Sequence, residues 1–429
     1  LEKILRNSPR PLDYLCLLKP LEDHSACEYL AQMPEVNELP LNRLARSKRE
    51  EFREKYIEFM GQVNISNHSR RWWAMPFTNK YSLTGQLCRN LFHFQLIVEA
   101  QNSTSQTLVV LTGNQDLAEQ VRRWGRNADI PVEEAIKERF DLKQAVRRSL
   151  PAGAAKAVLS SFLLWVLGRS LRPKRDTLSE HFLVATHTHT RSFSGDQTYG
   201  DVYFGPLVGD LAESDQKSII LGLPYEQPIR QLKKMKRLES GVPVVPVDSC
   251  MSILNLLNCA SQAVIAFWRP PKLNGPAEFD GLDVTYFVKQ AIKESTRSGD
   301  LFINLKMFYS ARWLAQRIRL GRCLYPYENR AWEKMLILGV GAGSQQTRLV
   351  GYQHTSITPH HFNFFLAKDE AAITPLPGAI VTCGDVTRDW IGRDGNYPSG
   401  MFSSACALRQ ELAVNEDGGR KQGSIANLL

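Results

Sequence analysis

The sequence lacks most of the short motifs that identify an enzyme class on their own. It has no P-loop, no G-x-S-x-G elbow, no H-E-x-x-H pair and no D-x-D run. These absences argue against an NTPase, a serine hydrolase, a zinc protease and metal-dependent glycosyl transfer of the GT-A type. No internal repeat or low-complexity tract occurs either.

Metal-binding cysteine patterns are also missing. The eight cysteines include no C-x-x-C pair, and no His/Cys spacing suits a zinc ion. Several cysteines stand in apolar runs, as buried free thiols do. We therefore expect no metal and no cofactor, and a reducing, cytoplasmic location.

No apolar run is long enough for a membrane span. The longest, residues 154–171, is interrupted by Lys156 and Arg169 and falls short of the roughly 20 apolar residues that a span needs. It is typical of a core helix. The basic residues 172–175 beside it leave open a peripheral contact with an anionic membrane.

The composition is that of a folded globular chain with a modest positive charge. Its 429 residues are 43% hydrophobic and 23% charged, and the formal net charge is +9. This length predicts two or three domains. The charge fits an anionic ligand, an anionic membrane or nucleic acid. We expect no nucleic acid, because the aromatic residues are not interleaved with the basic clusters.

Strand-length apolar runs alternate with helical stretches along the chain. Seven such runs begin near residues 107, 182, 218, 243, 323, 348 and 379. This alternation predicts an α/β fold with a mostly parallel, doubly wound sheet. The adjacent Trp72 and Trp73 are interpreted as core residues rather than a stacking platform.

Residues 321–355 form the predicted centre of the molecule, a strand, a helix and a second strand with polar residues after each strand. Ligands of open α/β sheets bind outside the carboxyl ends of the strands. Glu328 is a candidate base or hydroxyl ligand, whereas Glu333 is better placed to favour the helix dipole. His354 is a candidate proton shuttle or phosphate donor. Further candidate ligands adjoin these residues: Tyr327, Asn329, Gln353, Thr355 and Ser356.

Two other stretches resemble functional motifs. The glycines of GVGAGS, residues 339–344, follow a helical run and open a strand, which reverses the order of a dinucleotide-binding motif, so we expect a helix C-cap. His187 and His189 share one strand face, but no third ligand at a fitting spacing completes a metal site. The segment after them offers candidate ligands for sugar hydroxyls or an anion: Arg191, Ser192, Asp196 and Tyr199.

Several of these segments together resemble a known family. LYPYENRAWEK (324–334), LVGYQHTSITPHHFNFF (349–365) and PLPGAIVTCG (375–384) resemble the core of bacterial surface-carbohydrate biosynthesis proteins, which look like GT-B glycosyltransferases. RWWAMPFTNKYS (71–82) and FSGDQTYGDVYFGPLVGDL (193–211) resemble upstream segments of the same family. The best-understood neighbours of this family use CMP-activated ulosonic acids such as Kdo in O-antigen or capsule assembly.

The resemblance implies Rossmann-like domains that face one another across a cleft. We expect an N-terminal α/β region with helical segments in residues 1–175, an acceptor and cleft domain in 176–375, and the start of an incomplete donor-binding domain in 376–429. Tyr327, Glu328 and Asn329, together with Gln353, His354 and Thr355, would line the cleft. The implied substrates are a nucleotide sugar and a lipid-linked or polysaccharide acceptor at the inner face of the inner membrane.

Two functions therefore stand as alternatives. The first is a metal-independent glycosyltransferase that builds a surface polysaccharide. The second is a non-catalytic glycan-binding or membrane-assembly protein that keeps the same fold.

Overall fold

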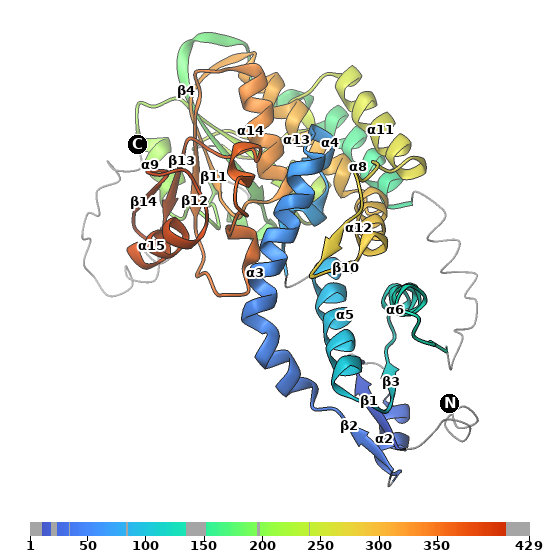
Figure 1. The fold of residues 1–429 in the computed structure, drawn as a ribbon. Helices are drawn as coiled ribbons and strands as arrows, with labels where there is room; N and C mark the ends of the chain where they lie inside the picture. The colour runs from blue at the N-terminus through green and yellow to red at the C-terminus, as the bar shows by residue number, and fades with distance from the viewer. Residues whose placement is uncertain are drawn as a thin grey trace.

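The computed structural model describes residues 11–18, 24–33, 35–82, 85–133, 152–194, 198–239 and 241–408. Its largest unit is a seven-stranded sheet with the order β14-β13-β12-β11-β4-β7-β8, in which every pairing is parallel (Figure 1). The strands are β4 (Asp176–Thr188), β7 (Ser218–Pro224), β8 (Val244–Pro246), β11 (Ile318–Pro326), β12 (Arg348–Gln353), β13 (Ala379–Thr382) and β14 (Phe402–Ser404).

Both faces of this sheet are buried, as the apolar character of its strands requires. In β4, Phe182 and Val184 point to one face and Leu183 and Ala185 to the other, because successive side chains of a strand alternate. The first face packs on α9 (Leu207–Glu213) and on Met235 of α10 (Pro228–Met235). The second packs on α13 (Asp300–Ala315), α14 (Ala331–Gly343) and α15 (Asp385–Asp394). Two covered faces are typical of parallel sheets.

The chain order creates a topological switch point between β4 and β11. From β4 the chain adds β7 and β8 on one side. It then returns through α11 (Ile253–Trp268), α12 (Thr285–Arg297) and α13 to place β11, β12, β13 and β14 on the other side. The predicted α/β fold with a parallel sheet is confirmed, and the strand order is compatible with a Rossmann-like fold.

A second, smaller sheet lies near the N-terminus. Its strands β1 (Leu12–Cys16), β2 (Val36–Glu38) and β3 (Thr107–Leu111) pair in parallel in the order β2-β1-β3. Two long helices, α3 (Leu41–Asn67) and α5 (Gln86–Ser103), run from this sheet towards the larger unit (Figure 1). All seven predicted runs form strands, but the one at residue 107 belongs to the small sheet.

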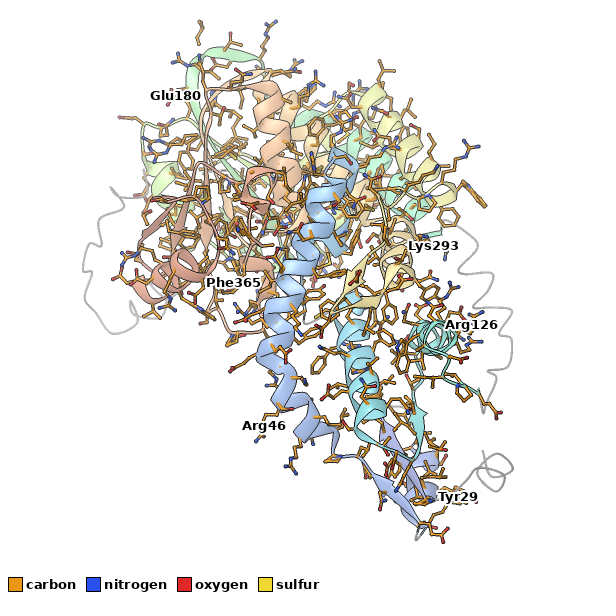
Figure 2. The ribbon with its side chains drawn as sticks, viewed as in Figure 1. Tyr29, Arg46, Arg126, Glu180, Lys293 and Phe365 are labelled. Atoms are coloured by element: carbon orange, nitrogen blue, oxygen red, sulfur yellow. The ribbon has the colours of Figure 1, made fainter. Side chains whose placement is uncertain are left out.

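A buried polar network joins α3 to the long connection between β12 and β13. The Lys80 ammonium pairs with the Glu370 carboxylate, and both side chains are 2% exposed. Asn64 donates to Glu370 over 2.8 Å and accepts from the Trp72 indole over 2.9 Å. We call these four residues the buried network. Nearby, Arg53 of α3 stacks over Phe365 at 4.2 Å, and Figure 2 shows Phe365 beside that helix.

Three expectations for the fold meet specific outcomes. Trp72 and Trp73 of α4 (Arg70–Trp73) are buried, which confirms their core assignment. Residues 376–408 do not open a separate sheet, since β13 pairs with β12 and β14 with β13. The glycines of GVGAGS do not adopt the left-handed C-cap conformation; instead, a Cβ on Gly339 would lie 2.4 Å from the Phe308 carbonyl oxygen, so this glycine lets α14 approach α13 closely.

The predicted core helix at residues 154–171 corresponds to α8 (Ala152–Leu167), which is half-buried. The Trp165 indole donates to the Met251 carbonyl over 3.0 Å, which anchors α8 to the larger unit. Among the residues that the structure describes, no helix is both long and apolar enough to cross a bilayer.

Candidate functional site

Ionisable and aromatic side chains converge at the topological switch point. They come from the carboxyl ends of three strands of the large sheet, β4, β11 and β12, and from the turns that follow them. Parallel strands end at one edge of a sheet, so residues distant in sequence meet there. Three of these residues form what we call the switch-point cluster: Glu328, Arg330 and His354.

The switch-point cluster is centred on a half-exposed carboxylate. Glu328 follows β11 and forms an ion pair with Arg330, whose side chain is 40% exposed against 22% for Glu328. His354 follows β12, and its Nε2 lies 3.7 Å from Glu328 Oε1. The two strand ends therefore meet as the sequence predicted, while the chemical roles of Glu328 and His354 remain predictions.

Aromatic side chains surround the imidazoles of His354, His187 and His189. The ring of Tyr203 meets His354 edge to face, with 4.7 Å between centroids. His189, after β4, lies 3.4 Å from the Tyr203 hydroxyl and packs on Tyr225. His187 packs on Trp332 of α14 at 5.0 Å. Burial, and then the positive charge of Arg330, lowers the pKa of His187 to about 4, so this imidazole is neutral at physiological pH.

Glu333 holds the Glu328 backbone in place through hydrogen bonds. It lies in the first turn of α14, and its two carboxylate oxygens accept the Glu328 backbone N–H at 3.1 and 3.0 Å. The Glu328 N–H precedes α14, and the expected interaction of Glu333 with the helix dipole stays a prediction. Burial, followed by the negative charge of Glu328, raises the pKa of Glu333 to about 8. Glu333 is therefore mostly protonated at neutral pH and holds the Glu328 turn in place.

Three predicted ligands are instead buried within the protein. The Tyr327 hydroxyl lies 2.8 Å from that of Tyr397, and its ring is 1% exposed. Asn329 has a positive φ of 55° and donates to the Asn363 carbonyl over 2.9 Å. Gln353 is fully buried and donates to the Thr355 carbonyl. These contacts hold the turns after β11 and β12 in place. We predicted that all three side chains line a cleft, but their burial favours a structural role.

The remaining predicted ligands divide between surface and core. Arg191 and Ser356 are exposed and Thr355 is half-buried. Ser192 is buried, and the Tyr199 hydroxyl donates to the Asp201 carboxylate over 2.7 Å. Asp196 lies outside the described residues.

Asp201 also fixes the turn at Tyr203. Its carboxylate accepts hydrogen bonds from the backbone N–H groups of Tyr203 and Phe204 at 2.7 and 3.1 Å. Tyr199 and Asp201 thus hold the turn that carries Tyr203 against His354.

Sequence reasoning missed several members of this site. Arg330 stood in the central motif without an assigned role, and Tyr203 and Tyr225 carried no signal of their own. His187 and His189 were weighed only as metal ligands. Their position at the end of a predicted strand, before the polar segment at 191–199, was the signal in the sequence that could have pointed to them.

The arrangement combines three chemical capacities at one sheet edge. The Glu328 carboxylate can accept a proton, the Arg330 guanidinium can bind an anion, and the His354 imidazole can donate a hydrogen bond. The surrounding aromatic rings present faces on which a base or a sugar can pack. Comparison with models of protein families, with curated proteins and with solved structures finds no match to this chain.

Proposed function

We propose that this protein is a metal-independent glycosyltransferase of the GT-B type, acting on a bacterial surface polysaccharide. The donor we favour is a CMP-activated ulosonic acid such as Kdo, as the resemblance of residues 324–334 and 349–365 implies. The observation that carries the proposal is the meeting of Glu328, Arg330 and His354 at the switch point of a parallel sheet. Ligands of open α/β sheets bind at this place.

Each member of the cluster has a role in the proposed transfer. The Glu328 carboxylate takes the proton of the acceptor hydroxyl, whose oxygen then bonds to the anomeric carbon of the donor. The bond between that carbon and the phosphate oxygen breaks, and CMP leaves with the electron pair. Arg330 binds the phosphate as its charge develops, and His354 donates a hydrogen bond to it. Atoms and charges balance without a metal.

A membrane contact would bring a lipid-linked acceptor to this protein. Side chains of α8 and α11 form an exposed apolar face around an open groove of about 420 Å³. Leu254 is 74% and Trp268 67% exposed. Lys156 on α8 and Arg169, two residues beyond its end, are exposed, so they can meet anionic headgroups while the apolar side chains enter the interface. We propose that this face rests on an anionic bilayer.

The transfer assay uses the purified chain, a CMP-ulosonic acid donor and a lipid-linked acceptor. Glu328→Gln and His354→Gln should each lower turnover by about 100-fold or more, in line with the loss of a catalytic group. Glu213→Gln and His68→Gln are the matched controls, since both side chains are exposed outside the cluster. Wild-type turnover in both cluster variants would refute the site.

A binding assay separates the enzyme from the non-catalytic alternative. A donor that binds the folded chain raises its melting temperature, and Arg330→Gln should abolish that rise. A glycan that raises the melting temperature when no nucleotide sugar does so would favour the non-catalytic protein.

Vesicle flotation tests the membrane contact. The wild type should float with vesicles of phosphatidylglycerol, and Leu254→Ser/Trp268→Ser should not. Val386→Ser, at an 84% exposed position on α15, is the control. A wild-type chain that dimerises through this face without binding vesicles would refute the contact.

A further inference from the structure

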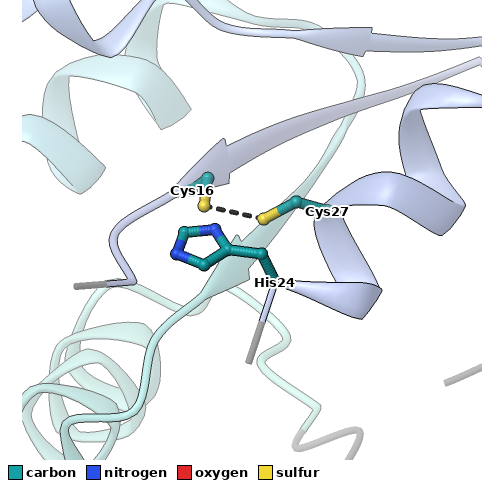
Figure 3. A group of neighbouring side chains, drawn as sticks. All are labelled: Cys16, His24 and Cys27. Carbon is teal, nitrogen blue, oxygen red and sulfur yellow. Dashed lines mark hydrogen bonds between the residues drawn. The ribbon is translucent and has the colours of Figure 1, made fainter. Parts of the chain in front are cut away.

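Three side chains with metal-binding atoms meet at one end of the small sheet. Cys16 is the last residue of β1, the central strand of that sheet. His24 directly precedes α2 (Ser25–Ala31), and Cys27 lies in the first turn of this helix. Figure 3 shows the two thiols and the imidazole facing one another. They form what we call the thiol-imidazole cluster.

The cluster is compact and partly shielded from solvent. The two sulfur atoms are 2.7 Å apart, and one ligand atom from each residue lies within 4.8 Å of the other two. All three side chains are half-buried. Among the described residues, no other group of three His, Cys, Asp or Glu side chains is close enough to hold a metal ion.

We propose that Cys16, His24 and Cys27 bind a zinc ion through two sulfur atoms and one imidazole nitrogen. The fourth position is left for water or another ligand. This inference does not depend on the proposed glycosyl transfer, because the thiol-imidazole cluster belongs to the small sheet and the switch-point cluster to the large one.

Zinc fits this donor set better than magnesium or calcium. Zinc binds Cys sulfur at about 2.3 Å and His nitrogen at about 2.0 Å, usually in a tetrahedron, whereas magnesium and calcium take oxygen ligands. Tetrahedral angles place two such sulfurs about 3.8 Å apart. The thiols must therefore separate by roughly 1 Å, which a rotation about the side-chain bonds of Cys16 and Cys27 can provide.

Glu28 and Glu38 add negative charge beside the cluster. Burial, then the hydrogen bond with Cys16 and the charges of Glu38 and Glu28, raises the pKa of Cys27 to about 12. A bound cation would offset this negative charge, and zinc binding would release the Cys27 proton to solvent.

The zinc ion would fasten the start of α2 to the end of β1. No side-chain hydrogen bond caps the start of α2, which has only seven residues. Coordination would tie this helix to β1 through a ring that includes the residues between Cys16 and His24. In an open parallel sheet, the carboxyl end of the central strand is also a common position for a ligand.

Cobalt(II) titration of the full chain, stripped of metal by a chelator under reducing conditions, tests the proposal. We expect one Co²⁺ per chain, thiolate-to-cobalt absorption in the near ultraviolet, the visible bands of a tetrahedral site, and loss of these bands on adding Zn²⁺. Cys16→Ser, Cys27→Ser and His24→Gln should each weaken binding by at least about 100-fold. Cys406→Ser and His68→Gln, which alter side chains outside the cluster, should retain it.

Two results would overturn the proposal. One is a wild-type chain that shows no tetrahedral Co²⁺ bands, and the other is a chain whose bands persist in all three cluster variants. The first result comes from the wild-type chain, so it tests zinc binding even if a variant fails to fold. A Cys16–Cys27 disulfide that forms under the same reducing conditions and excludes metal would also contradict zinc binding.

Discussion

Two ion pairs of this protein each join a basic side chain to a glutamate and differ in their surroundings. Lys80 and Glu370 are each 2% exposed, and Asn64 and the Ala367 backbone N–H also bond the same carboxylate. Glu328 and Arg330 stand at a sheet edge and are 22% and 40% exposed. Burial distinguishes a structural ion pair from one that can bind a ligand. The hydrogen-bonding groups of the first pair are taken up by the protein, whereas the second pair is still accessible to a ligand.

The electrostatics follow the same division. Burial alone would raise the pKa of Glu370, but the Lys80 ammonium and the hydrogen bonds outweigh it and lower that pKa overall. Glu370 is thus held as a charged partner of Lys80. Next to the switch-point cluster, the carboxyl with the shifted pKa is Glu333, whose raised pKa keeps it neutral where it bonds to the Glu328 N–H. The first pair, with Asn64 of α3, lies buried against the β12–β13 connection, and the second is partly exposed to solvent.

The largest expected effect comes from breaking the buried pair. Lys80→Met leaves the Glu370 carboxylate buried without its ammonium, which should lower the free energy of unfolding by about 3–5 kcal/mol. Urea denaturation measures this loss. Arg330→Met is the matched variant, and its cost should stay below about 1 kcal/mol because the two side chains are 40% and 22% exposed rather than buried. Equal losses in the two variants would contradict the comparison.

A smaller loss is expected where α3 touches the segment that carries Glu370. A Cβ on Gly61 would lie 2.0 Å from the Ala367 Cβ. Gly61→Ala should therefore push α3 outward and cost about 1–3 kcal/mol. Gly209→Ala, on α9 with no atom near the added methyl group, is the control and should be neutral or stabilising. An unchanged free energy of unfolding for Gly61→Ala would show that α3 and the Ala367 segment can move apart without cost.

The pH dependence of stability should report on Glu333. The unfolded chain releases this proton near pH 4.5 and the folded chain near pH 8, so unfolding releases a proton between these values. Stability should fall with rising pH across that window, by at most about 1.4 kcal/mol per pH unit. Lys334, whose pKa is lowered by burial to about 8, adds its opposite slope only above pH 8.

Glu333→Gln should remove this slope. Urea denaturation of both proteins at pH 5.5 and 7.5 gives the change in their difference, which cancels the titration of groups that they share. Parallel pH profiles for the wild type and the variant would rule out a raised pKa for Glu333.

The smallest effect on stability should come from the residue with the largest proposed role in catalysis. Glu328→Gln keeps the shape of the side chain and removes a half-exposed charge, so the free energy of unfolding should change by less than about 1 kcal/mol. The same substitution should abolish transfer. A loss above about 2 kcal/mol in urea denaturation would assign Glu328 to the scaffold instead.

The sequence predicted features that depend on neighbouring residues. Each of the seven predicted apolar runs forms a strand, because a buried strand requires such a run, whereas β14 of the large sheet was not predicted. The placement of Glu328 and His354 after adjacent strands predicted that they meet. The burial of Trp72 followed from the packed turn around it.

Features that depend on distant pairs could not be predicted in this way. Lys80 and Glu370 lie 290 positions apart, and nothing local marks either as a buried partner. The cysteine spacing of the thiol-imidazole cluster matches no zinc motif, because β1 and α2 supply its shape rather than a tight turn. The glycines of α14 looked like a cap, since the sequence does not reveal that α13 lies against them.

Hydrogen exchange with and without the CMP-ulosonic acid donor tests the central contrast most directly. We expect slower exchange in residues 327–333 and 354–358, which carry the switch-point cluster, and no change in residues 76–82 around Lys80. Protection around Lys80 without protection of the two strand-end turns would contradict it.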